Sequence, residues 1–300
     1  MRSQLRSEND KGIKFVSDGC CDLCKQIDSR VDSSQKRAYS TRQHLILSIF
    51  LKGTLHPMMA FSAFFDASGN ESKQEPLAVA GYIASREQWL LFERDWNETL
   101  KKAGLRYFHM TEFINRSGQF KGWERTKRSH LFDSLTTLIE VRVRKAFGCI
   151  VLCDALDLVN RKYFLTERLG HAFPMSAMTV LGRVFVWSAQ IGHRQPILSV
   201  FEDGDRHKGE LQKLAKRYLP EELRPIFQSK RLAPLQAADI AAWDLRNVVA
   251  KIQELAKIDI WEKSYKRLHR IPNDYQSRGE KELVGLCHDL KIPLRSAAPV

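Results

Sequence analysis

The chain has 300 residues, 43% of them hydrophobic, which is enough to bury a full core in one large domain. Its net charge is +13, which favours a polyanionic partner such as nucleic acid, although a membrane surface or an acidic protein would also satisfy it. No apolar run approaches the roughly 20 residues that span a bilayer, and the best candidate, Leu45 to Leu51, follows a polar stretch that does not fit a signal peptide. We therefore expect a cytoplasmic protein without a membrane partner.

The first 57 residues are rich in Ser, Gln, Asp and Arg and show little periodicity, which is typical of a flexible tail. We expect residues 1–57 to form a basic N-terminal extension, residues 58–255 the main domain and residues 256–300 a C-terminal extension. Alternatively, the native protein starts at Met58 or Met59, and the upstream residues are not part of it.

The six cysteines are too few and too irregularly spaced for a disulfide framework, so we expect reduced thiols. Cys21 and Cys24 form a CxxC pair, but no second Cys or His pair follows at zinc-finger spacing. An incidental cluster in the tail is favoured over a zinc site.

Two apolar runs, Phe61 to Phe65 and Leu77 to Ala84, are separated by a turn-forming Ser-Gly-Asn stretch and predict a β-hairpin. Ser85 then offers an N-cap, and Gln88 follows three residues later as in a capping box. This spacing predicts a helix from Arg86 to about Lys102.

The rest of the chain alternates between strand-like and helix-like segments, which predicts an α/β fold. Strands are expected at Tyr107 to Met110, Arg144 to Cys153 and Ile197 to Phe201. Helices are expected at Trp123 to Val141, Pro174 to Ile191, Lys208 to Tyr218 and Leu235 to Ile252.

Acidic residues follow two of the expected strands. Asp66 ends the first apolar run, and Glu202 and Asp203 follow Ile197 to Phe201. Ligands of open α/β sheets bind beyond the carboxyl ends of the strands, so these positions are candidates for a site. Asp239 lies among small and apolar helix residues, where a charge is costly without a partner, and we expect it to face the same acids.

Three gathered carboxylates would repel one another and raise each other's pKa unless a divalent cation joined them. Hard oxygen ligands on a partly hydrated site are what Mg²⁺ prefers, with Mn²⁺ as its substitute. The acidic residues therefore predict a magnesium or manganese site.

Four short motifs resemble, in order, those of the family called domain of unknown function 3800. They are Phe64 to Gly69, Phe108 to Glu112, Phe201 to Asp203 and Leu235 to Asp239. That family is widespread in bacteria and phages and is viewed as ribonuclease H-like. The resemblance spans about residues 59–250 and implies a ribonuclease H-like mixed sheet flanked by helices.

The resemblance also implies a nuclease-type site. Its metal ligands would be Asp66, Asp203 and Asp239, with Glu202 beside them, and Glu112 would be a further catalytic acid. Two bound cations would hold the scissile phosphate, and hydrolysis of a phosphodiester in DNA or RNA would follow. Substrate contacts are expected from Ser68, His109, Lys208, Lys230 and Arg231.

Structural alternatives remain for several of these residues. Asp66 could cap the following turn, and Asp239 could be the buried partner of Arg231 or Arg246. His109, a lone histidine after a short apolar run, fits a structural or substrate-contacting role better than catalysis.

A second function class is a ribonuclease H-like scaffold that binds nucleic acid but has lost turnover. Ala67 favours this class, because the family usually has Glu after the first Asp. The presence of Asp66, Asp203 and Asp239 together favours the enzyme.

Overall fold

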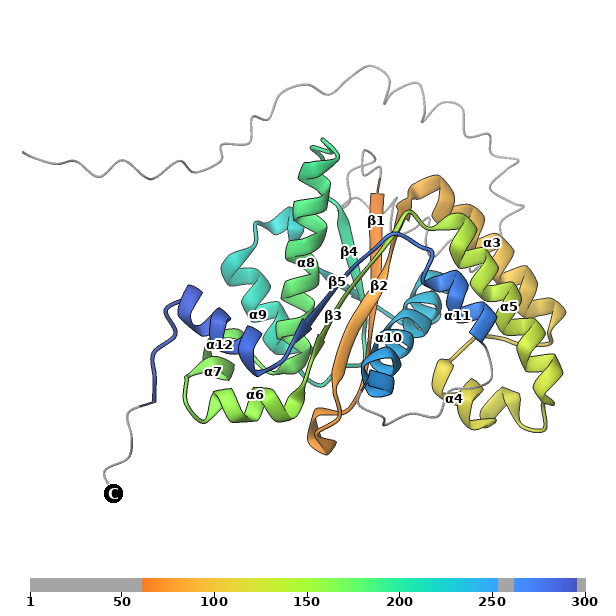
Figure 1. Cartoon of the computed structure of the whole chain (residues 1–300). Helices are drawn as coiled ribbons and strands as arrows, with labels where there is room; N and C mark the ends of the chain where they lie inside the picture. The colour runs from red at the N-terminus through yellow and green to blue at the C-terminus, as the bar shows by residue number, and fades with distance from the viewer. Residues whose placement is uncertain (1–60, 253–261, 296–300) are drawn as a thin grey trace, which may run out of the picture. The chain divides into compact units, whose positions relative to one another are not determined.

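A central six-stranded sheet carries helices on both faces (Figure 1). The computed structural model describes residues 61–252 and 262–295. The strands are β1 (Phe61–Ser68), β2 (Leu77–Ser85), β3 (Lys145–Val151), β4 (Leu198–Glu202), β5 (Ile226–Gln228) and β6 (Asn273–Arg278). Their order is β5-β4-β1-β2-β3-β6, and the pairs β1/β2 and β2/β3 are antiparallel whereas β1/β4, β4/β5 and β3/β6 are parallel. The predicted α/β class is confirmed, with a mixed sheet flanked by helices.

The helices form two groups, one against each face of the sheet (Figure 1). One group contains α3 (Arg86–Lys102), α4 (Met110–Asn115), α5 (Arg125–Arg142), α10 (Ala233–Ile252) and α11 (Glu262–Leu268). The other contains α6 (Cys153–Asn160), α7 (Leu165–Leu169), α8 (Ala172–Gln190), α9 (Lys208–Tyr218) and α12 (Glu280–Asp289). None of the helices in the described ranges is long and apolar enough to cross a membrane.

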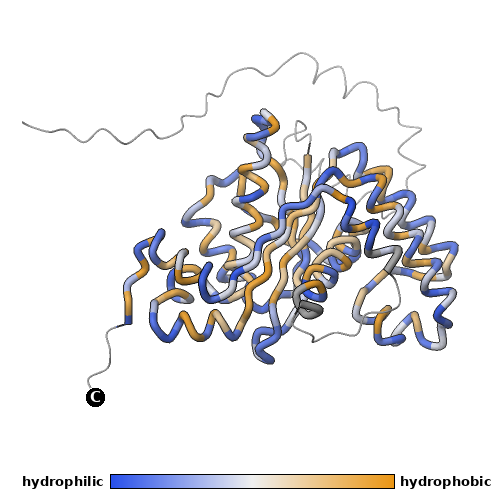
Figure 2. Tube along the Cα trace, viewed as in Figure 1, coloured by the Kyte–Doolittle hydropathy of each residue, from blue (hydrophilic) through white to orange (hydrophobic). Residues whose placement is uncertain are grey.

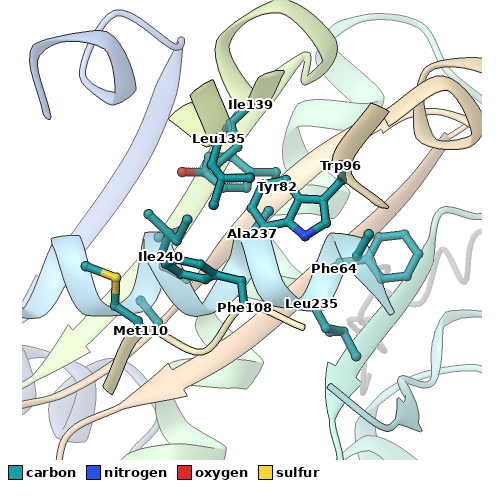
Figure 3. Packing of buried hydrophobic residues seen from close by; sticks show 14 of the residues in the cluster. Phe64, Tyr82, Trp96, Phe108, Met110, Leu135, Ile139, Leu235, Ala237 and Ile240 are labelled. Atoms are coloured by element: carbon teal, nitrogen blue, oxygen red, sulfur yellow. The ribbon is translucent and has the colours of Figure 1, made fainter. Parts of the chain in front are cut away.

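Two hydrophobic cores lie on the two faces of the sheet. Hydrophobic residues are frequent along the central strands (Figure 2). Phe64 and Tyr82 belong to the core beneath α10 and α3, where Trp96 and Phe108 pack with Leu235 and other buried residues (Figure 3). Because side chains of a strand alternate between its faces, the neighbouring Phe65 belongs to the core beneath α8.

The predicted hairpin is confirmed by β1 and β2, and the predicted helix after it is α3. The Ser85 hydroxyl accepts a hydrogen bond from the Gln88 backbone N–H at 3.3 Å, as the capping pattern indicates. The predicted helix from Lys208 to Tyr218 is α9 with the same bounds. The other expected strands and helices differ from β3, β4, α5, α8 and α10 by only one or two residues at their ends, apart from the strand discussed next.

The strand expected at Tyr107 to Met110 is wrong. This segment pairs with no described strand. Two of its backbone N–H groups donate hydrogen bonds to side chains of α10 instead. The Phe108 N–H donates to Gln236 Oε1 at 2.8 Å, and the Met110 N–H donates to Asp239 Oδ2 at 2.7 Å. Burial of Phe108 and Met110 explains the strand-like apolar pattern without a strand.

The boundary expected after residue 255 also needs correction. β6 pairs with β3 as the last strand of the same sheet, and α11 packs against α5. β6 is an edge strand that is only partly buried, and its sequence, Asn-Asp-Tyr-Gln-Ser-Arg, contains no apolar run. The sequence therefore gives no signal for a strand here. The expected tail at residues 1–57, its CxxC pair and the alternative start at Met58 or Met59 lie outside the described residues.

A candidate active site of buried carboxylates

Asp66 and Glu202 face the same side of the sheet at the carboxyl ends of adjacent strands. Phe64 of β1 and Val200 of β4 lie in the core between the sheet and α10. Because side chains alternate along a strand, the residues two positions further on, Asp66 and Glu202, face that side as well. β1 and β4 are parallel neighbours in register, so these two carboxylates come from matching positions.

Asp239 reaches the same place from α10. It is buried, with 5% of its surface exposed, and Asp66 is 4% exposed. The Lys230 ammonium lies 2.9 Å from Asp66 Oδ2 and 3.5 Å from Asp239 Oδ1, so a single cation contacts both carboxylates. The sequence-predicted meeting of these two acids is therefore observed, and Lys230 is part of the cluster.

The electrostatics of the cluster combine burial with the Lys230 charge. Burial raises the pKa of Asp66 to about 6. The charge of Lys230 acts to lower this pKa, and the charge of Asp239 acts to raise it. Burial likewise raises the pKa of Asp239 and of Glu202. For Lys230 burial alone would lower the pKa, but the charges of Asp66 and Asp239 outweigh it and the pKa is raised. The ammonium thus stays charged and compensates carboxylates that burial disfavours.

His109 and Glu112 border this cluster at the N-terminus of α4. His109 Nε2 lies 3.9 Å from Asp239 Oδ2, and its Nδ1 lies 3.9 Å from Glu112 Oε1. Burial and, next, the nearby Lys230 charge lower the pKa of His109, so its imidazole is neutral at pH 7. Glu112 accepts a hydrogen bond from the Tyr107 hydroxyl at 2.8 Å and has no direct contact with Asp66 among the described interactions.

Asp203 is directed elsewhere. Its carboxylate accepts a hydrogen bond from the Lys208 ammonium at 2.6 Å, and its side chain is 48% exposed. Glu202, the residue before Asp203, faces the same side of the sheet as Asp66. Glu202 therefore joins the cluster and Asp203 does not. The expectation that Asp203 is a central ligand does not fit this geometry, and the period of two along β4 is the signal that separates the pair.

The other sequence-predicted contacts lie around the cluster. Ser68 is half-buried at the end of β1, and Arg231 is exposed beside Lys230. The suggested arginine partners of Asp239 are wrong, because its cation is Lys230 and Arg246 pairs with Glu75 at 3.2 Å. Asp66 does accept a hydrogen bond at its Oδ1, from the Ala67 N–H at 2.7 Å, while its Oδ2 faces the ammonium.

Ala67 does not remove a carboxylate from the cluster. It follows Asp66 in β1, and it packs against the core on the α8 face of the sheet. A side chain at this position faces away from Asp239 because of strand alternation. Glu in place of Ala67 would therefore not add to the group formed by Asp66, Glu202 and Asp239.

A pocket opens beside Asp66 at the edge of the sheet, with a volume of 160 Å³. Glu202 and Lys230 line it together with Gly69, and Asp205 lines it from the loop after β4. A water molecule takes about 30 Å³ of liquid, so this volume holds several waters or a hydrated ion. Asp66 and Glu202 line the pocket, but Asp239 does not. The rest of the lining includes Phe65, Ala67, Phe173 and Phe201 of the core on the α8 face.

Gln236 holds this site together and was missed as a functional residue in the sequence. Its Oε1 accepts hydrogen bonds from Trp96 Nε1 at 2.9 Å and from the Phe108 N–H at 2.8 Å. Its Nε2 lies within hydrogen-bond distance of the backbone oxygens of Lys230 and Arg231, at 3.2 and 3.3 Å. One buried amide therefore positions both the Lys230 turn and the segment that leads to His109. An amide among small and apolar helix residues, three positions before Asp239, was the available signal.

Replacing Gln236 by Ala is expected to lower the free energy of unfolding by about 2 to 4 kcal/mol, because it leaves two buried N–H donors without an acceptor. Urea unfolding of the full chain measures this change. Gln212→Ala, at an exposed position of α9, is the control and should stay within about 0.5 kcal/mol of the wild type. Equal effects of the two substitutions would contradict the role of Gln236.

Comparison with known proteins adds no assignment to this geometry. No protein-family model matches the chain, and no curated protein matches it either. The resemblance to domain of unknown function 3800 therefore stays a prediction, carried by the four motifs alone.

Proposed function

We propose that the chain is a divalent-cation-dependent nuclease that hydrolyses phosphodiesters in nucleic acid. The observation that carries the proposal is the convergence of Asp66, Glu202 and Asp239 on one face of the sheet. The ammonium group of Lys230 contacts both aspartates. Buried carboxylates are rarely retained without a partner or a metal, and such clusters are common at catalytic sites.

The donor set fits Mg²⁺ or Mn²⁺. All three side chains offer hard oxygen ligands, and the pocket of 160 Å³ beside Asp66 and Glu202 leaves room for the waters that Mg²⁺ keeps. The Lys230 ammonium bridges two of the carboxylates, where an ion would otherwise balance their charge. We infer that an ion would be held by Asp66, Glu202 and Asp239 and that Lys230 would move aside from them.

When bound, the metal would activate a water and stabilise the leaving oxygen of the phosphodiester. His109, neutral and 3.9 Å from Asp239, is placed to accept a proton at Nε2. Lys230, once released from the carboxylates, is positioned to contact the phosphate. Gln236 keeps both groups at the site through its bonds to the segments that carry them.

The mixed sheet is compatible with the ribonuclease H-like expectation, since β2 runs antiparallel to its neighbours, β4 and β5 run parallel to β1, and helices cover both faces. The net charge of +13 supports a polyanionic substrate. Lys216 and Arg217, in the last turn of α9, are exposed and add positive charge to the surface. These features support nucleic acid as the substrate class without selecting DNA or RNA.

A catalytically inactive nucleic-acid-binding scaffold is the second candidate. The contact that favours it is Lys230, because an ammonium that already neutralises Asp66 and Asp239 makes a metal unnecessary for stability. In that case the basic surface would bind nucleic acid, and the carboxylates would serve only to hold Lys230.

Asp66→Asn and Asp239→Asn are expected to weaken Mg²⁺ or Mn²⁺ binding at least about 100-fold and to reduce cleavage at least about 1,000-fold, since each removes a charged ligand. Titration calorimetry and assays on single- and double-stranded DNA and RNA measure the two effects. Asp203→Asn is the matched control, because its carboxylate binds Lys208, and it should stay within about threefold of the wild type. A wild type that binds nucleic acid but no metal would contradict the nuclease and leave the scaffold.

Lys230→Met should raise the affinity for Mn²⁺ by about tenfold or more and should lower the melting temperature in EDTA, because the ammonium competes with the ion for the same carboxylates. Melting curves with and without Mn²⁺ and calorimetry check both effects. Lys216→Met on the exposed face of α9 is the control and should change neither. An unchanged Mn²⁺ affinity in Lys230→Met would mean that Lys230 and the ion do not share a site.

A further inference from the structure

A second cluster of metal-ligating side chains lies on the other face of the sheet, away from Asp239. His171 precedes α8, His207 precedes α9, and Glu210 lies in the first turn of α9. His171 Nδ1 is 2.9 Å from both oxygens of Glu210, and His207 Nδ1 is 3.0 Å from Glu210 Oε1. The two imidazole rings stack with their centroids 4.1 Å apart, so both Nδ1 atoms face one carboxylate.

We propose that His171, His207 and Glu210 form a binding site for a divalent transition metal of the Zn²⁺ class. One ligand atom from each residue lies within 4.8 Å of the others. Zinc binds nitrogen and oxygen ligands at about 2.0 to 2.2 Å, which places two tetrahedral ligands roughly 3.4 Å apart. The observed separations of 2.9 to 3.0 Å need to widen by only a few tenths of an ångström to admit the ion.

Glu71 provides an independent indication of the same ligand. Its Oε2 atom is buried and has no hydrogen-bond partner among the described residues, and it lies 3.6 Å from His207 Nε2 and 3.9 Å from Arg206 Nη2. When the Nδ1 of a histidine binds a metal, its Nε2 carries the proton, and a carboxylate usually accepts it. Glu71 stands where that acceptor is required, and metal binding would supply the hydrogen bond that Glu71 Oε2 lacks.

The existing hydrogen bonds of the three ligands must change when an ion binds. Both Nδ1 atoms now contact the Glu210 carboxylate, and each would contact the ion in its place. The Arg206 Nε–H, which donates to His207 Nε2 at 2.8 Å, opposes the site, since that proton must give way when Nε2 becomes protonated. The Arg206 side chain is 57% exposed, but it also contacts Glu71 Oε2 at 3.9 Å and donates to the Ser72 hydroxyl, so it would have to change these contacts when an ion binds.

The chemistry of the donors separates this site from the carboxylate cluster. Two imidazole nitrogens and one carboxylate suit borderline metals such as Zn²⁺ better than Mg²⁺, which prefers an all-oxygen set. Three protein ligands leave one coordination position free. His171 and Glu210 line a groove of 370 Å³ together with Glu167, Lys213 and Arg217, so a water or a small anion could reach the ion from there.

The ion would join three segments that surround the pocket beside Asp66. The loop after β1 carries Glu71, whose Oε1 also accepts a hydrogen bond from the Ala172 N–H at 3.3 Å. His171 and His207 fix the starts of α8 and α9. Binding would therefore stabilise the loops after β1 and β4, and it requires none of the ligands of the proposed nuclease site.

Zinc titration calorimetry of the full chain tests the proposal, with Cys20, Cys21 and Cys24 changed to Ser because these thiols can also bind zinc. One equivalent of Zn²⁺ should bind and raise the melting temperature. His207→Ala should weaken binding at least about 100-fold, and Glu71→Gln should weaken it about 10- to 100-fold through the lost acceptor. His130→Ala, at an exposed position of α5, is the control and should bind as the parent does.

Cobalt serves as the spectroscopic probe, because a nitrogen and oxygen set gives visible bands without the sulfur-to-metal charge transfer of thiolates. Those bands should be present in the parent and absent in Glu210→Gln. Because Glu210→Gln keeps the size of the side chain, it also tests the site if His207→Ala does not fold. Unchanged zinc affinity in folded His207→Ala or Glu210→Gln would overturn the site. Asp66→Asn should retain zinc binding whether or not the nuclease proposal holds. Loss of zinc binding in Asp66→Asn would contradict a zinc site that is separate from the carboxylate cluster.

Discussion

The ammonium of Lys230 between Asp66 and Asp239 is the interaction on which the rest of the site depends. Two carboxylates with 4% and 5% of their surface exposed are costly to ionise together, and a cation 2.9 Å from one and 3.5 Å from the other compensates them. Lys230 is held in turn by Gln236, whose amide group lies 3.2 Å from its backbone oxygen. The site is thus built around one positive charge, and the proposed chemistry follows if a metal ion takes over that role.

The carboxyl ends of β1 and β4, with the loops that follow them, contribute residues to both candidate cation sites. Asp66 lies near the end of β1 and Glu71 follows that strand, and Glu202 ends β4 and His207 follows it. The first member of each pair faces α10 with the hard oxygen donors, whereas the second contributes to the cluster with imidazole nitrogens. A single topological feature, the adjacent parallel strands β1 and β4, therefore brings chemically different ligand sets to the two faces.

Much of the fold could be predicted from local signals, and the site could be predicted in part. The hairpin, the Ser85 cap and α9 follow from apolar periodicity and capping, which depend on neighbours in the sequence. Strand alternation would also have separated Glu202 from Asp203. The sequence could not reveal the path of Tyr107 to Met110, since its backbone bonds go to side chains more than a hundred residues away. Nor could it reveal β6, a polar edge strand, or the bridging position of Lys230, because these depend on tertiary contacts alone.

The most direct test of the carboxylate site is a crystal structure of the full chain soaked in Mn²⁺, with anomalous diffraction to locate the ion. We expect an anomalous peak bonded to oxygens of Asp66, Glu202 and Asp239, at about 2.0 to 2.3 Å for a hard divalent cation, with the Lys230 ammonium displaced from both aspartates. A structure in which Lys230 still bridges Asp66 and Asp239, with no peak at the three carboxylates, would contradict the account.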